Sequence, residues 1–275
     1  MQAKWLIQNH YDLEGKDLIP ELEKQGIEYK MVDYEPLQSG TYNHLFNAND
    51  CVIVHSTLNM AQQLRREVAW IPGVYCNFDN MKCTTYYSHW GNFLLNNDYV
   101  MIPFMEFVRR SDEFYKMFGV DGCIFIRPNN GTKSFTGHVL PKDELESETK
   151  IINQYSNIDL DKLLIIISSP KVIDVEWRVV IADKQVVTLS QYKKDGKLNT
   201  NNDTSNYDVL KLARGMAKHD WQPDRVYTID IALSNGVYSL LEINSFSCSG
   251  LYNCDYSAVV KYVSLVAENE WMEYN

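Results

Sequence analysis

The strongest constraint on the fold is a predicted hairpin near the C-terminus whose strands carry acidic residues. The segments VYTIDIAL and VYSLLEIN are rich in β-branched and aromatic residues and flank Asn235-Gly236, a pair typical of a tight turn between strands. Asp230 lies in the first segment, and Glu242 and Asn244 lie in the second. Glu242 and Asn244 are two residues apart, so a strand places both side chains on one face. Carboxylate and amide oxygens suit Mg²⁺, which predicts a magnesium site; acids that face solvent on an edge hairpin are the alternative.

The predicted metal site places a condition on the register of this hairpin. A regular two-residue turn at Asn235-Gly236 pairs Asp230 with Leu241 and leaves Glu242 on the opposite face. An odd-length loop or a bulge instead pairs Asp230 with Glu242. We therefore expect an irregular turn within residues 234–238.

The first eighty residues alternate strand-like and helix-like segments, which predicts a small parallel α/β layer. No GxGxxG follows the first strand, so the fingerprint of dinucleotide binding is absent. After this layer we expect two α+β units, the second richer in strands. The predicted boundaries are an N-terminal α/β domain at residues 1–80, a small subdomain at 81–166 and a C-terminal subdomain at 167–275.

Two further segments carry groups suited to a nucleotide. The loop RPNNGTKSFTG combines glycines and hydroxyls with Arg127 and Lys133, which suits phosphate oxygens, although it lacks the GxxxxGK[ST] pattern and an ordinary basic turn is the alternative. Glu176 and Arg178, in the segment EWR, share one face of a predicted strand. They could hold a ribose and a phosphate, and a cross-strand ion pair is the alternative.

The order of these segments resembles the ATP-grasp superfamily. A phosphate-binding hairpin is followed by the apolar strand LLIIISSP, then by E-x-R, and then by D…E-x-N. The resemblance covers roughly residues 80–275 and looks closest to divergent members that carry Arg-Pro where better-known ligases carry Lys-Pro. It implies α/β and α+β architecture, in which a small N-terminal parallel layer precedes a two-subdomain fold that clamps ATP.

The resemblance also implies roles for individual residues. Asp230, Glu242 and Asn244 would ligate Mg²⁺ on the ATP phosphates, and Arg127 takes the place of the phosphate-contacting lysine. The segment Ser168-Ser169-Pro170 would be the hinge that binds adenine, and Glu176 would bind the ribose. The other implied ATP contacts are Lys82, Lys133, Ser134, Thr136 and Arg178. The residues implied to stabilise the reacting phosphoryl group are Arg127, Arg178 and Arg225.

After Asn244, the segment SFSCSGLYNCDYS is implied to form the acceptor side of the site. Ser247, Ser249 and Gly250 could donate hydrogen bonds to an anionic intermediate there. Cys248 is expected to be a buried thiol rather than a nucleophile, because no histidine is close in the sequence.

The activity implied is that of an ATP- and Mg²⁺-dependent ligase, which joins a carboxylate to an amine (or a thiol) through an acyl phosphate. A phosphotransferase with the same site and a non-catalytic nucleotide-binding module are the alternatives. The substrates would be a small molecule or peptide pair, and a homodimer through the N-terminal layer is a further expectation. The net charge of −10 argues against a broad nucleic-acid surface. No run of about 18 apolar residues predicts a membrane span, so we expect a cytoplasmic protein.

Overall fold

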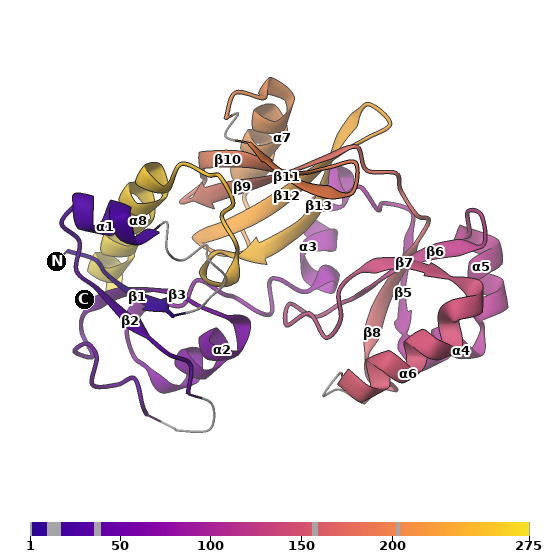
Figure 1. Cartoon of the computed structure of the whole chain (residues 1–275), viewed down its shortest axis with the longest axis horizontal. Helices are drawn as coiled ribbons and strands as arrows, with labels where there is room; N and C mark the ends of the chain where they lie inside the picture. Colours follow the sequence, from indigo (N-terminus) through magenta and orange to yellow (C-terminus); the bar gives the residue numbers. More distant parts are fainter. Residues whose placement is uncertain (1, 10–17, 36–39, 156–158, 202–203, 275) are drawn as a thin grey trace.

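The structure is a computed structural model that describes residues 2–9, 18–35, 40–155, 159–201 and 204–274. Three sheets organise it: one parallel and two antiparallel (Figure 1). The mixed α/β and α+β class expected from the sequence is confirmed. No helix in these ranges is long and apolar enough to cross a membrane.

The N-terminal sheet is parallel, with strand order β2-β1-β3-β4. Its core contains Trp5 and Ile53, and the C-terminal helix contributes Val260 and Val263 to the same core. The two ends of the chain are therefore packed together, as Figure 1 shows on its left side. The elements are β1 (Lys4–Gln8), α1 (Leu18–Lys24), β2 (Tyr29–Val32), β3 (Cys51–His55), α2 (Leu58–Glu67), β4 (Ile71–Gly73) and the C-terminal α8 (Tyr256–Tyr274).

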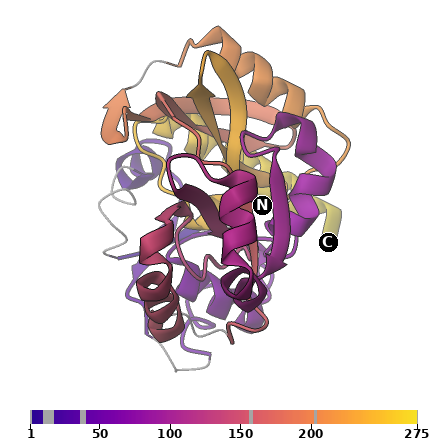
Figure 2. The ribbon, with the colours of Figure 1, turned by 90° about the vertical axis from the view of Figure 1, so that its right-hand side faces the viewer.

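The small sheet is antiparallel, with order β5-β8-β6-β7, and lies at the opposite end of the molecule. Figure 2 views the molecule from this end. Ile124, Ile126 and Ile165 pack in the core that this sheet forms with its helices. Side chains alternate along a strand, so Phe125 and Arg127 point to the other face. The elements are β5 (Tyr99–Pro103), α4 (Phe104–Arg109), α5 (Ser111–Phe118), β6 (Cys123–Pro128), β7 (His138–Pro141), η3 (Lys142–Glu144), α6 (Leu145–Tyr155) and β8 (Leu164–Ser168).

The C-terminal sheet is antiparallel, with order β11-β10-β9-β12-β13. One face packs against α3 and α7, through Tyr86 and Trp90 among others. The other face joins the core of the N-terminal sheet, through Val180 and Val226. Helix α3 thus packs on the C-terminal sheet although it precedes the small sheet in sequence. The elements are α3 (Cys83–Trp90), η2 (Gly91–Phe93), β9 (Val175–Ala182), β10 (Gln185–Lys194), β11 (Lys197–Asn201), α7 (Tyr207–Ala217), β12 (Val226–Ser234), β13 (Val237–Ser245) and η4 (Phe246–Cys248).

The hairpin of β12 and β13 has a regular turn and an irregular ladder. Asn235 and Gly236, with φ values of 50° and 77°, form the two-residue turn, and Ser234 pairs with Val237. The expected irregularity at residues 234–238 is therefore wrong. The register shifts at a bulge instead: Ile231 pairs with Leu240, Asp230 pairs with Glu242, and Leu241 is the extra residue. The two acids are directly opposite, as a shared metal site requires.

Candidate functional site

The bulge brings the three predicted metal ligands together. The Asn244 amide Nδ2 donates to Asp230 Oδ2 and to Glu242 Oε1, each at 3.2 Å. Within the described ranges no group of three or more His, Cys, Asp or Glu side chains could hold a metal. A cation here would bind two carboxylates and an amide, completed by phosphate oxygens or waters, which is a usual environment for Mg²⁺.

Asp230 is held by a buried, bidentate ion pair with Arg178. Arg178 lies directly opposite Asp230 on the neighbouring strand β9. Its Nε and Nη2 atoms donate to the two carboxylate oxygens at 2.8 Å each, and Nη1 donates to the Gly250 carbonyl at 2.7 Å. Burial raises the pKa of Asp230, and the charge of Arg178 opposes that rise. For Arg178, the ion pair left open by the sequence is thus realised.

Two tyrosines hold the Arg178 guanidinium in place. The rings of Tyr192 and Tyr252 stack at 4.6 Å with an interplanar angle of 8°, and the guanidinium carbon lies 5.7 and 5.2 Å from their centroids. This geometry suits cation–π attraction. Tyr192 also donates its hydroxyl to Glu176, so one aromatic side chain contacts both predicted residues of the EWR segment.

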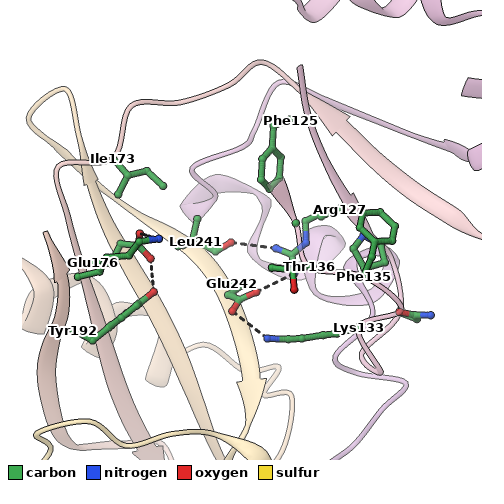
Figure 3. A pocket seen from close by; sticks show the side chains of 14 residues that line it. Phe125, Arg127, Lys133, Phe135, Thr136, Ile173, Glu176, Tyr192, Leu241 and Glu242 are labelled. Atoms are coloured by element: carbon green, nitrogen blue, oxygen red, sulfur yellow. Dashed lines mark hydrogen bonds and ion pairs between the residues drawn. The ribbon is translucent and has the colours of Figure 1, made fainter. Parts of the chain in front are cut away.

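Glu242 joins the small sheet to the C-terminal sheet through two cations (Figure 3). Its carboxylate oxygens lie 3.3 Å from Arg127 Nη2 and 3.3 Å from Lys133 Nζ. Burial alone would raise the pKa of Glu242, but Lys133, Arg127 and Arg178 outweigh it and lower the pKa to about 2. Arg127 Nη1 also donates to the carbonyl of Leu241 at 3.4 Å, so the bulged residue supplies an acceptor to the arginine.

A first cavity of about 310 Å³ lies between the two antiparallel sheets. This is the lower end of the size range of ligand pockets. Its apolar lining includes Phe125, Phe135, Ile173 and Leu241. Its polar lining includes Arg127, Lys133, Thr136, Glu176, Tyr192 and Glu242, and Figure 3 shows the two groups around the same space.

A second cavity of about 280 Å³ lies on the other side of the phosphate-binding loop. Arg127, Asn130 and Lys133 line both cavities. The second cavity is bounded further by Asn244 and Ser245 of β13 and by Cys248 and Ser249. The cationic pair therefore separates two spaces that meet beside the candidate metal ligands.

Close backbone approach at two glycines shapes the loop between these cavities. A Cβ atom on Gly137 would lie 3.0 Å from Arg127 Cβ and 3.1 Å from Phe125 Cζ. A Cβ on Gly131 would lie 2.8 Å from Met81 Cβ. Both contacts are tighter than side chains normally tolerate, so glycine lets the loop approach Arg127 and the segment before α3.

The predicted adenine hinge lies at the edge of the first cavity. Ser168 pairs with Phe125 across β8 and β6, so its side chain shares the sheet face of Phe125 and Arg127. Its hydroxyl is buried and has no hydrogen-bond partner in the described part of the chain, as expected for a polar atom that awaits a ligand. Ser169 instead donates to Asp98 at 2.5 Å, and Pro170 has no N–H to donate.

The remaining predicted residues are divided between the site and other places. Thr136 lines the first cavity, and Ser134 is hydrogen-bonded to Asn130. Lys82 precedes α3 and pairs with Asp79 at 2.7 Å; it lines neither cavity. The structure does not bring Arg225 to the cluster, because its guanidinium pairs with Glu273 of α8.

Several lining residues were not predicted. Phe125 could have been found, because it lies two residues before Arg127 on the same strand face. Tyr192 and Lys193, whose Nζ lies 3.1 Å from Glu176, depend on the pairing of β10 with β9, which no local pattern indicates. The residues present fit a nucleotide and a divalent cation: an apolar slot, an orphaned hydroxyl, two cations and an oxygen ligand set adjoin one another.

Solved structures place this fold in the class of ATP-grasp ligases. D-alanine–D-alanine ligase from Bacillus anthracis is 13% identical over all of both chains, with a TM-score of 0.61. A RimK domain ATP-grasp protein from Sphaerobacter thermophilus is 11% identical over 98% of each chain, with a TM-score of 0.59. The ATP-grasp ligase PsnB, complexed with a minimal precursor, is 14% identical over 97% of this chain and 100% of its own, with a TM-score of 0.59. At such identities the likeness shows the fold alone.

The chain belongs to the ATP-grasp family. The sequence profile of an ATP-grasp domain, the second family of its clade, matches residues 110–262, which is more than half of the chain. The match includes Arg127, Arg178 and all three candidate metal ligands, whereas Lys82 lies outside it. A search of curated proteins gives no match. The superfamily resemblance is thereby confirmed, and the Arg-Pro feature stays a prediction.

Proposed function

We propose that this protein is an ATP- and Mg²⁺-dependent ligase that joins a carboxylate to an amine through an acyl phosphate. The observation that carries the proposal is the shared wall of the two cavities. Arg127 and Lys133 line both spaces, so they can stabilise negative charge on a phosphoryl group in one and on a carboxylate in the other. Such a wall suits phosphoryl transfer between two bound substrates.

The nucleotide would occupy the first cavity. Phe125, Ile173 and Leu241 would contact the base, and the buried hydroxyl of Ser168 would meet its edge. Glu176, oriented by Tyr192, would accept hydrogen bonds from the ribose. Phosphate oxygens would compete with Glu242 for Arg127 and Lys133, which pair with that carboxylate in the structure.

The candidate metal ligands lie where the two spaces meet. Asp230, Glu242 and Asn244 would hold Mg²⁺, which when bound neutralises phosphate charge as a Lewis acid. Arg178 keeps the Asp230 carboxylate in one orientation through its bidentate contact. The low pKa of Glu242, about 2, keeps this ligand ionised throughout the physiological range.

The proposed reaction has two steps. An oxygen of the carboxylate substrate attacks the γ-phosphorus, and the bond from that phosphorus to the β,γ-bridging oxygen breaks to release ADP. The amine nitrogen then attacks the acyl carbon, the bond to the phosphate oxygen breaks, and inorganic phosphate leaves as the nitrogen loses its proton. Arg127 and Lys133 would hold the transferred phosphoryl group through both steps.

Thermal unfolding with ATP or ADP, each with and without Mg²⁺, tests the nucleotide site. A ligand at a hundred times its dissociation constant stabilises the native state by about 2.7 kcal/mol. We expect a Mg²⁺-dependent stabilisation that Glu242→Gln abolishes. The matched control is Glu146→Gln, since the Glu146 side chain is exposed and pairs only with Lys150 among the ion pairs of the described residues. No stabilisation of the unmodified protein by millimolar nucleotide would refute the proposal.

The chemistry is tested separately by trapping. Hydroxylamine converts an acyl phosphate into a hydroxamate, so a ligase should release ADP and form a hydroxamate when given its carboxylate. A phosphotransferase would instead give a stable phosphorylated product, and a binding module would give no ADP. Either of these outcomes would contradict the ligase.

A further inference from the structure

We infer that the second cavity binds a small carboxylate with an apolar body and no ammonium group. This deepens the proposed function and rests on it, since the cavity is taken as the site of the acyl donor. Its volume of about 280 Å³ lies just below the usual range for drug-sized ligands. The inference is carried by the chemistry of the cavity walls.

The polar wall is suited to an anion. Arg127 and Lys133 supply positive charge, and Asn130, Asn244, Ser245 and Ser249 supply amides and hydroxyls. None of the described residues that line this cavity is acidic. A carboxylate placed here would lie against the same two cations that face the first cavity.

The nearest carboxylates are already paired. Glu242 is held by Arg127 and Lys133 at 3.3 Å each, and both oxygens of Asp230 are held by Arg178. An ammonium group in the second cavity would therefore be desolvated beside two cations without a carboxylate to receive it, which is unfavourable. An α-amino acid would incur this cost and its deaminated analogue would not.

The opposite wall is apolar and comes from three parts of the fold. Leu58 begins α2, Met81 precedes α3, and Ile243 lies in β13. The Cys248 thiol adjoins them. Met81 is buried and abuts Gly131, so this wall cannot easily retreat, and a short aliphatic chain fits it best.

Cys248 supplies a reporter for occupancy. Its hydrogen bond with the Cys76 thiol lowers the pKa of Cys248, which favours alkylation. Burial raises the pKa of Cys254 to about 12, so that thiol should stay unreactive. Cys123, half-buried and lining neither cavity, is the matched control thiol.

The test measures carbamidomethylation of each cysteine by mass spectrometry under limiting iodoacetamide, with Mg²⁺ and a non-hydrolysable ATP analogue present. The probes are 4-methylpentanoate, leucine, which adds only the α-ammonium group, and 4-methylpentanamide, which removes the charge. We expect 4-methylpentanoate to slow labelling of Cys248 at least tenfold at saturation, with no change at Cys123. Leucine and the amide should protect far less.

A variant reverses the expected preference. Leu58 is half-buried at the first position of α2, where an acidic side chain is favourable, so Leu58→Asp should fold. It should lose protection by 4-methylpentanoate and gain protection by leucine, whereas Leu58→Asn should do only the former. Equal or better protection of the unmodified protein by leucine, or none by the carboxylate, would overturn the inference. If the nucleotide still stabilises the protein in that case, the proposed function stands.

Discussion

Replacing Asp230 with asparagine should destabilise the protein as well as remove a metal ligand. The Asp230 side chain is 1% exposed and that of Arg178 is 8% exposed, so neither group can recover its hydration in the folded state. Asparagine keeps the shape but cannot accept two charge-assisted hydrogen bonds. Arg178 would be left with the Gly250 carbonyl and the faces of two tyrosines.

The expected loss follows from this geometry. Removing one partner of a buried ion pair typically costs about 3–5 kcal/mol, because the other charge stays buried without compensation. For a chain of this size, about 2 °C of melting temperature corresponds to each kcal/mol, so Asp230→Asn should melt roughly 6–10 °C lower. Replacing both partners should cost less than the sum of the single changes.

The assay is a double-mutant cycle of Asp230→Asn and Arg178→Met, followed by urea and thermal unfolding without nucleotide. We expect a coupling of at least about 2 kcal/mol between the two sites. Arg178→Met should also be less harmful at low pH, because Asp230 can then bind a proton. Glu146→Gln, in an exposed pair with Lys150, should change stability by less than about 0.5 kcal/mol. A loss below about 1 kcal/mol for Asp230→Asn, or additive single changes, would refute the reasoning.

Three other predictions concern separate parts of the molecule. Arg127→Lys loses the planar fork that contacts Glu242 and Leu241, so calorimetry should show about tenfold weaker ADP binding with Mg²⁺; unchanged affinity would exclude the phosphate role. The pKa of Glu242, about 2, lies below its unfolded value, so its stabilisation is complete above about pH 4.5 and is lost as pH falls toward 2; the acid limb of the stability curve should be shallower in Glu242→Gln, and an unchanged limb would contradict this. Burial raises the pKa of Asp224 to about 7, so the folded state binds the extra proton and stability should fall as pH rises from about 4 to 7; Asp224→Asn should remove that part of the slope, which unfolding at several pH values would measure.

Much of the architecture follows from local and periodic patterns. The alternation of strands and helices in the first eighty residues predicts the parallel sheet, and β-branched runs predict the antiparallel strands. Asn235-Gly236 predicts the two-residue turn, because both residues tolerate the positive φ that this turn requires. The order of the phosphate loop, E-x-R and D…E-x-N also indicates the family, since that order lies in the chain itself.

The geometry of the candidate site depends on contacts that no local pattern contains. The bulge at Leu241 is a property of the ladder between β12 and β13, and without it Asp230 and Glu242 would face opposite sides. The Arg178–Asp230 pair exists because β9 lies beside β12, although the two residues are far apart in sequence. Arg225, five residues before Asp230, instead pairs with Glu273.

The same distinction separates the motifs from the cavities. Residue types along the chain determined which groups could bind phosphate and metal, because charge and hydrogen-bonding capacity belong to each side chain. Only the tertiary structure decided that Arg127 and Lys133 line two spaces, and that Leu58, Met81 and Cys248 share one of them. Those cavities form where separate sheets and helices meet, and their shape is set by packing between segments that are distant in sequence.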